Sequence, residues 1–211
     1  TECGTVLRKG RITKNDSTAV SLLRDSGAII MGKTVTTEFA YFDPGKTCNP
    51  HDVSRTPGGS SSGSAASVAS YMCPLSIGSQ TNGSMIRPAS YCGVYGFKPT
   101  IGLVSRFGAL RQSRFLDQVG FFARSINDIA LISEELIRYD EYDEESVRFS
   151  GKGILDIATS KVPLDPHFAF IKTPRWKLLD QDSTDSFEKL KKKLGQNIEE
   201  CKLPDYFEKL Y

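Results

Sequence analysis

Histidine is nearly absent from this chain, which contains only two among its 211 residues. A catalytic mechanism that relies on a histidine base is therefore poorly supported. Cysteine is also scarce, and the five cysteines form no CxxC pair. An odd number without paired spacing argues against a disulfide framework or a zinc site. We therefore expect a reducing, cytoplasmic setting, with no metal and no cofactor.

Net charge and long apolar runs are lacking as well. The 27 basic and 25 acidic residues leave a formal charge of only +2, so no partner attracted by a strong electric field is indicated and no nucleic acid is expected. No apolar run approaches the length that spans a bilayer, so no membrane partner is expected either. The hydrophobic content of 39% is ordinary for a globular protein. At this length we expect a single domain over residues 1–211.

What the sequence does contain is an alternation of amphipathic helices with short apolar strands. The helices are predicted at 16–27, 62–72, 125–137 and 183–195, and the strands at 28–31, 73–79, 168–173 and 198–203. Residues 34–56 show no sustained period and are expected to form a long surface loop. Helices that alternate with short strands predict an α/β architecture.

Serine and glycine are concentrated between Gly58 and Ser90. A flexible linker is excluded, because the same stretch also contains an apolar helix and an apolar strand. Within it, GSSSG at 59–63 matches a nucleophile elbow centred on Ser61, but a polar loop precedes it where a buried strand is required. A Ser-His-Asp enzyme therefore stays open as a poor alternative.

A second short motif also fails in its context. GAIIMGKT, at 27–34, has the letters of a phosphate-binding loop. Such a loop follows a strand and opens a helix, whereas this segment follows a helix and its middle residues favour a buried strand. We therefore do not expect a nucleotide to bind here.

Three longer stretches resemble the amidase signature family of serine hydrolases. They are RTPGGSSSGSAASVAS, PLSIGSQTNGSMIRPASYCGVYGFKPTIGLVSRFG and LDQVGFFARSINDIALI. They occur in consecutive order, and the likeness extends outward through AIIMGKTVTTEFAYFDPG and more weakly to the C-terminus. The resemblance implies an α/β fold with a mixed, twisted β-sheet and helices on both faces. Residues 1–211 would then form a single partial amidase domain.

The resemblance also implies a Ser, cis-Ser, Lys triad. Its nucleophile would be Ser84 in TNGSMIRPAS, and its bridging serine, held through a cis peptide bond, would be Ser60 in PGGSSSGS. The backbone amides just before the nucleophile, at Thr81, Asn82 and Gly83, would form the oxyanion hole. Ser84 would attack an amide carbonyl while Ser60 passes its proton to a neutral lysine, and water would then cleave the acyl-enzyme.

The chain departs from the family pattern in three places. Asn82 stands where members usually have a small residue, and Gln80 stands where many members have aspartate. The catalytic lysine of the family belongs to a Lys-Asp motif upstream of the region matched by Thr1. No lysine in this chain is followed directly by an aspartate. We therefore expect a fragment without the lysine segment and the C-terminal part, inactive when alone.

These residues predict an amidohydrolase that cleaves a carboxylic amide to an acid and an amine or ammonia. Its expected partner is a small-molecule amide, and a homodimer is left open. Two alternatives remain: the amidase subunit of a tRNA-dependent amidotransferase, which would need glutamine, a partner subunit and tRNA, and a catalytically dead relic of the fold. Gln80 and the loop EFAYFDPG favour the amidohydrolase over the amidotransferase subunit.

Overall fold

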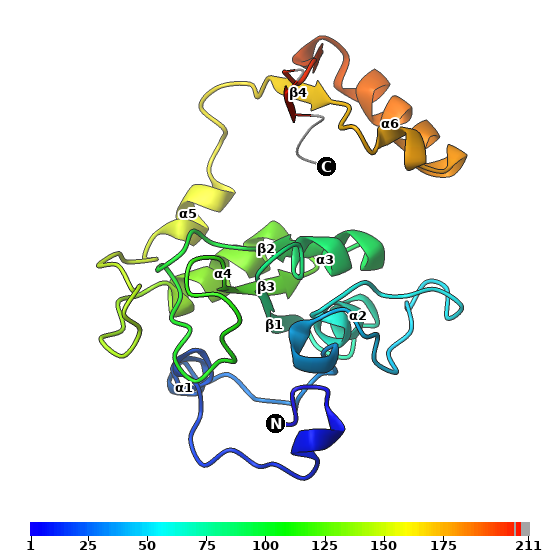
Figure 1. Cartoon of the computed structure of the whole chain (residues 1–211). Helices are drawn as coiled ribbons and strands as arrows, with labels where there is room; N and C mark the ends of the chain where they lie inside the picture. The colour runs from blue at the N-terminus through cyan, green and yellow to red at the C-terminus, as the bar shows by residue number, and fades with distance from the viewer. Residues whose placement is uncertain (205, 208–211) are drawn as a thin grey trace. The chain divides into compact units, whose positions relative to one another are not determined.

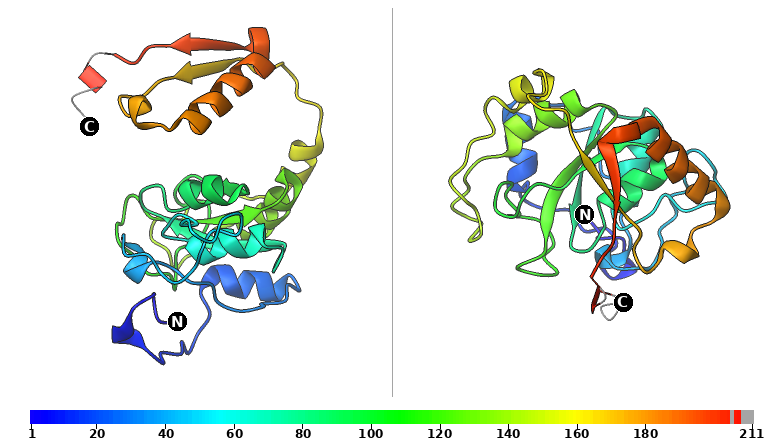
Figure 2. Two further views of the ribbon diagram at one scale, coloured as in Figure 1. Left: turned by 90° about the vertical axis from the view of Figure 1, so that its right-hand side faces the viewer. Right: turned by 90° about the horizontal axis from the view of Figure 1, so that it is seen from above.

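The computed structural model describes residues 1–204, 206 and 207, which form two compact units (Figures 1 and 2). The first unit is Thr1–Ser160 and the second is Lys161–Tyr211. The expectation of one domain over residues 1–211 stays a prediction. Among the described residues, no helix has both the length and the apolar character needed to cross a membrane.

The first unit is built around a three-stranded antiparallel sheet in the order β1-β3-β2 (Figure 1). Its strands are β1 (Leu75–Gln80), β2 (Tyr95–Phe97) and β3 (Gln118–Ala123). Its helices are α1 (Thr18–Asp25), α2 (Ser62–Ala69), α3 (Ile86–Cys92), α4 (Ile126–Leu136) and α5 (Ile154–Thr159), with 3-10 turns at η1 (Val6–Arg8) and η2 (Glu38–Ala40). The central strand pairs Gly120 with Gly78 of β1 and Phe121 with Phe97 of β2.

The central strand β3 contributes to two hydrophobic cores because successive side chains of a strand point to opposite faces. Phe121 belongs to a core with α4 residues such as Ile129 and Ile132. Its neighbour Phe122 belongs to another core, made with the small side chains of α2 and with Met85. Every residue of β3 is buried, as expected for a strand covered on both faces. The α/β class and the helices on both faces of the sheet are confirmed.

The second unit is a βαβ arrangement with a two-stranded parallel sheet. Its elements are β4 (Phe168–Ile171), η3 (Trp176–Leu178), α6 (Gln181–Leu194), η4 (Gly195–Asn197) and β5 (Ile198–Cys201). Phe170 packs against the rings of Trp176 and Phe187 at centroid distances of 5.3 and 6.0 Å. The helix and the two strands predicted in this region are confirmed.

The predicted strand at 28–31 is wrong. These residues have no regular structure, and the side chains of Ile29 and Met31 are 84% and 77% exposed. No described strand pairs with them, so the apolar run has neither ladder partners nor a core to enter. The same segment opens no α-helix after Lys33, which agrees with rejecting the phosphate-loop motif.

Candidate active site

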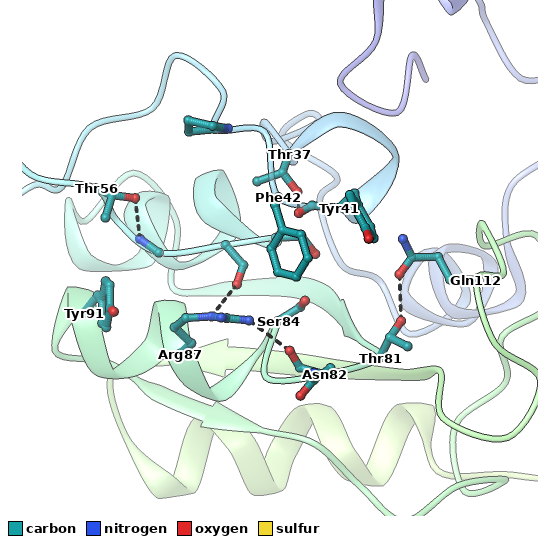
Figure 3. Close-up of a pocket in the computed structure, with 15 residues that line it drawn as sticks. Thr37, Tyr41, Phe42, Thr56, Thr81, Asn82, Ser84, Arg87, Tyr91 and Gln112 are labelled. Carbon is teal, nitrogen blue, oxygen red and sulfur yellow. Dashed lines mark hydrogen bonds between the residues drawn. The ribbon is translucent and has the colours of Figure 1, made fainter. Parts of the chain in front are cut away.

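Ser60 and Ser84 lie at one cavity, although 24 positions separate them in sequence. Ser60 comes just before α2 and Ser84 just before α3, and the backbone N–H of Ser61 donates to the Ser84 carbonyl at 3.3 Å. The cavity has a volume of about 490 Å³, and Thr81 and Asn82 also line it (Figure 3). Gly83 lies in the same loop with a φ of +78°. The five residues singled out from the sequence therefore lie in two adjoining segments.

Glycines allow these two segments to approach each other. Gly58 has a φ of +80°, and a Cβ there would lie 2.9 Å from the Cα of Pro88, near the start of α3. A Cβ on Gly59 would lie 2.9 Å from the Thr37 methyl group. A larger residue at Gly58 would require a shift of the backbone, and one at Gly59 would require the Thr37 side chain to move. The peptide bond between Gly59 and Ser60 is cis, the form that the resemblance implies for a bridging serine.

Most serine hydroxyls around α2 are bonded to backbone carbonyls. Ser61 donates to Ser79 at 3.1 Å, Ser62 to Val35 at 3.2 Å and Ser64 to Ile77 at 2.7 Å. These bonds tie α2 to β1 and to the segment before η2. The high serine content of the motif is therefore largely structural.

Ser60 differs from these serines. Its Oγ is buried and has no hydrogen-bond partner among the residues that the structure describes. A buried polar atom without a partner is unfavourable by about 1–3 kcal/mol, and in a native protein such an atom often marks a functional position. Ser61, the centre of the elbow motif, instead shares its hydroxyl with both backbone groups of Ser79, so a nucleophilic role for Ser61 is not supported.

The loop before Ser84 is held by Gln80. The side-chain carbonyl of Gln80 accepts from the backbone N–H groups of Met85 and Ile86, at 2.8 and 3.2 Å. A carboxylate oxygen of aspartate is also an acceptor, so the glutamine keeps the acceptor character of this position. Ser84 itself is only 7% exposed.

The amides in front of Ser84 are available as donors. Over residues 1–204, 206 and 207, no acceptor is found for the backbone N–H groups of Asn82, Gly83 and Ser84. Free amides beside a nucleophile are the usual material of an oxyanion hole. The assignment of this segment as the oxyanion hole stays a prediction that the geometry supports.

Arg87 joins the two segments and was missed by the sequence analysis. Its Nε donates to the Gly59 carbonyl at 3.2 Å, and its Nη2 donates to the Asn82 carbonyl at 2.9 Å (Figure 3). Arg87 lies in the first turn of α3, three residues after Ser84. That spacing was the one signal in the sequence that could have identified it.

The opposite wall of the cavity is closed by the loop before β3. The hydroxyl of Thr81 lies 2.5 Å from a carboxylate oxygen of Asp117 and 2.8 Å from the side-chain oxygen of Gln112. The Gln112 amide group donates to the Phe39 carbonyl at 2.7 Å. Gln112 therefore connects the nucleophile loop to the segment that carries Tyr41 and Phe42 at the cavity.

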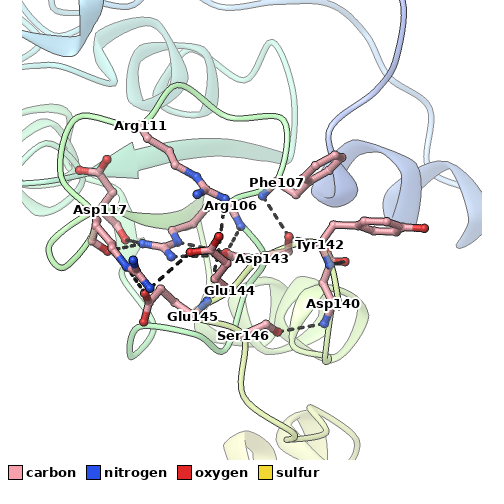
Figure 4. Close-up of polar contacts among 12 residues, drawn as sticks. Arg106, Phe107, Arg111, Asp117, Asp140, Tyr142, Asp143, Glu144, Glu145 and Ser146 are labelled. Carbon is pink, nitrogen blue, oxygen red and sulfur yellow. Dashed lines mark hydrogen bonds and ion pairs between the residues drawn. The ribbon is translucent and has the colours of Figure 1, made fainter.

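Behind this wall, Arg106 and Asp143 form a buried ion pair (Figure 4). The backbone N–H, Nε and Nη2 of Arg106 all donate to the Asp143 carboxylate, at 2.8, 3.0 and 2.9 Å. Burial alone would raise the pKa of Asp143, but these bonds and one from the Glu145 amide outweigh it and lower the pKa to about 2. Arg106 also donates to the carbonyls of Arg114 and Asp117, which fixes the loop that ends at the cavity.

Metal ligands are not gathered at this site. Within the described part of the chain, no group of three or more His, Cys, Asp or Glu side chains could hold a metal ion. His51 lies with its Nε2 2.8 Å from the Cys92 carbonyl at the end of α3, which docks the preceding loop. The described residues at the cavity offer hydroxyls, backbone amides, the side-chain amides of Asn82 and Gln112, and the guanidinium of Arg87.

The fold and this arrangement define the class of protein. Residues 1–209 match the family model described as Amidase, and the chain belongs to that family. The recognition made from the serine motifs is thereby confirmed. Membership of this family indicates amide hydrolysis, without specifying the amide.

Individual relatives show which members of the family the chain is similar to. Over 153 residues the chain is 47% identical to a glutamyl-tRNA(Gln) amidotransferase subunit from Gloeothece citriformis, an alignment that covers 70% of this chain and 32% of the relative. The chain thus spans about a third of the length of the curated relatives it matches. The crystal structure of the subunit of the same name from Thermotoga maritima is 33% identical with a TM-score of 0.79, covering 97% of this chain and 47% of that one. Native peptide amidase from Stenotrophomonas maltophilia is 31% identical with a TM-score of 0.81, covering 97% and 45%.

These names correct the partner prediction. The sequence analysis expected a small-molecule amide, no nucleic acid, and left a homodimer open. The matched relatives are instead named as one subunit of an amidotransferase for glutamyl-tRNA(Gln). The prediction is wrong because the net charge of a whole chain does not report contacts that a partner subunit or a local surface makes.

Proposed function

We propose that residues 1–211 carry the nucleophile and the bridging serine of a glutamine-hydrolysing amidase subunit of a tRNA-dependent amidotransferase. The names of the matched relatives support this choice among amidases. The observation that carries the chemistry is the buried, unpartnered hydroxyl of Ser60 at the same cavity as Ser84. The cavity volume of about 490 Å³ lies within the range that holds small ligands such as glutamine.

In the proposed reaction, Ser84 Oγ forms a bond to the amide carbon of the glutamine side chain. Its proton passes to Ser60, whose hydroxyl can both accept and donate because it has no hydrogen-bond partner among the described residues. The carbon–nitrogen bond then breaks, and nitrogen leaves as ammonia with the returned proton. Water cleaves the acyl-enzyme to glutamate and restores Ser84.

Two features of the site suit the intermediate. The free amides of Asn82, Gly83 and Ser84 would donate to the negative oxygen that develops on the carbonyl. Gln80 and Arg87 hold the loop that carries these amides, so that the donors are fixed before the substrate arrives. In the family that the chain resembles, a neutral lysine completes the triad as the base behind the bridging serine.

A second candidate is hydrolysis of an amide with an apolar group and no transfer to tRNA. The observation that favours it is the set of aromatic side chains at the cavity, Tyr41, Phe42 and Tyr91. Their rings offer an apolar surface that glutamine, with its charged α-carbon groups, would use little. The match to peptide amidase is consistent with such a substrate.

The test compares three serine variants in the complete polypeptide that contains residues 1–211. Ammonia release from glutamine is measured with and without the partner subunits and glutamyl-tRNA. We expect Ser84→Ala to reduce kcat by more than about 10⁴-fold and Ser60→Ala to reduce it strongly, because both act in one proton-transfer chain. The matched control is Ser90→Ala, an exposed serine on α3 whose loss leaves the rate unchanged.

Two outcomes contradict the proposal. Unchanged ammonia release in Ser84→Ala removes Ser84 as the nucleophile. A wild-type polypeptide that cleaves a peptide amide but releases no ammonia from glutamine under any of these conditions favours the second candidate instead.

A further inference from the structure

Arg87 is the only charged side chain at the cavity, among the residues described as lining it. It is half-buried, and it forms no ion pair in the described part of the chain. Its two hydrogen bonds go instead to backbone carbonyls on opposite sides of the site, those of Gly59 and Asn82. Because no acidic partner offsets the guanidinium charge, its hydrogen bonds to these two carbonyls are charge-assisted and stronger than neutral ones.

The two bonds use the edge of the guanidinium formed by Nε and Nη2. This edge is rigid and planar, so it fixes the separation of the two carbonyls that it bridges. One carbonyl belongs to the residue before Ser60, and the other lies two residues before Ser84. Gly83 leaves room for the bridge, because a Cβ there would lie 3.1 Å from Nη2.

The bond to Asn82 also acts on a neighbouring donor. The Asn82 carbonyl and the Gly83 N–H belong to the same peptide group. A hydrogen bond to the carbonyl of a peptide group polarises its N–H and strengthens it as a donor. The Gly83 N–H is one of the free amides in front of Ser84.

We propose that Arg87 is a positioning residue for amide cleavage, which sets the spacing of the Ser60 and Ser84 segments and strengthens the Gly83 amide as an oxyanion donor. The inference rests on the proposed function for the roles of Ser60 and Ser84. It adds that Arg87 acts on the transition state through the backbone and does not bind the substrate. Replacing Arg87 is therefore expected to lower kcat and to change KM little, because oxyanion donors act mainly after the nucleophile attacks.

The experiment uses Arg87→Gln and Arg87→Lys in the complete polypeptide with its partner subunits. We expect kcat to fall by about 10- to 100-fold in both variants, with KM within about threefold of wild type. Lysine retains the charge but cannot hold two carbonyls at a fixed separation, so it should not restore the rate. The matched control is Arg24→Gln, which removes an exposed arginine on α1 that pairs with Asp16.

A second readout does not depend on the substrate. A fluorophosphonate probe reacts with an activated serine: the serine oxygen bonds to phosphorus, fluoride leaves, and the serine proton passes to the base. The rate of Ser84 modification, followed by intact mass and peptide mapping, should fall by about the same factor as kcat in both Arg87 variants. Circular dichroism and a melting curve show whether each variant is folded.

Several results overturn the inference. A raised KM with unchanged kcat would make Arg87 a substrate-binding residue, and wild-type kcat and probe rates would leave it without any role in the reaction. If Arg87→Gln does not fold, Arg87→Lys decides, and wild-type rates in that variant reject the bridge. Failure of the proposed function is distinct: it appears as Ser84→Ala retaining its activity, or as no reaction of wild-type Ser84 with the probe.

Discussion

Asp143 receives three hydrogen bonds from Arg106, and its side chain is fully buried. Removing one partner of such a pair leaves an uncompensated buried charge. We expect Asp143→Asn to lower the free energy of unfolding by about 3–5 kcal/mol, measured by urea denaturation. The control is Asp16→Asn, which breaks an exposed ion pair and should change stability by less than about 1 kcal/mol. A loss below about 1 kcal/mol for Asp143→Asn would contradict the reasoning.

The same residue gives a pH dependence with a definite sign. The pKa of Asp143 is lowered to about 2 in the folded chain, so the unfolded chain takes up the proton at a higher pH. The stabilisation by Asp143 is complete above about pH 4 and is lost as the pH falls toward about 2. The difference in unfolding free energy between wild type and Asp143→Asn should therefore shrink over this interval. A difference that stays constant from pH 4 to pH 2 would disagree with the lowered pKa.

At the residue scale, the sequence could indicate side chains that sit in recognisable motifs. Ser60 and Ser84 were selected in this way, and the structure places both at one cavity. Asp117 and Gln112 could not be selected, because their contact with Thr81 depends on how a distant loop folds back. Local spacing carries no information about such a tertiary contact.

Gly78 lies in the middle of β1, where an added side chain would meet the chain neighbours of both candidate catalytic serines. A Cβ there would lie 2.6 Å from the Met85 sulfur and 2.7 Å from the Ser61 hydroxyl. We expect Gly78→Ala to lower the free energy of unfolding by about 1–3 kcal/mol through overpacking, measured by thermal or urea denaturation. It should also lower kcat, because the displaced residues adjoin Ser60 and Ser84.

Gly32→Ala is the matched control for this change. A Cβ added at Gly32 would meet no neighbouring atom within 4 Å, and the φ of Gly32 is not positive. Its replacement should leave both stability and kcat near the wild-type values. Equal stability of Gly78→Ala and Gly32→Ala would show that the sheet tolerates a methyl group at β1.

Among the elements, the predictions succeeded where local signals and tertiary packing agree. α4 was predicted from its apolar period and its cap, and Ser125 does accept from the Asp128 N–H at 3.1 Å. The prediction of a strand at 28–31 failed because an apolar run forms a strand only when another strand pairs with it. The sequence analysis did not predict β3 as a strand, although it is the centre of the first unit, since its continuous apolar run lacks the alternation of a half-buried strand.

For the whole molecule, the division at residue 160 predicts where a protease acts. Residues 161–167 are exposed and contain no helix or strand, whereas residues 60–69 are almost entirely buried. We expect limited trypsin digestion to cleave after Lys161 well before it cleaves after the buried Arg106, since proteases act on exposed, unpaired backbone. Mass spectrometry of the fragments over time gives the order of cleavage. Cleavage at Arg106 before Lys161 would contradict the division.

Phe121 and Phe122 are neighbours in the chain but belong to different cores. A single residue inserted or deleted just before Val119 would turn Val119, Phe121 and Ala123 from the core that contains α4 to the core that contains α2. Side chains with a Cβ would then replace Gly120 on the face where Met85 now packs closely. A substitution in β3 therefore affects one core, while a change of its length by one residue affects both cores at once.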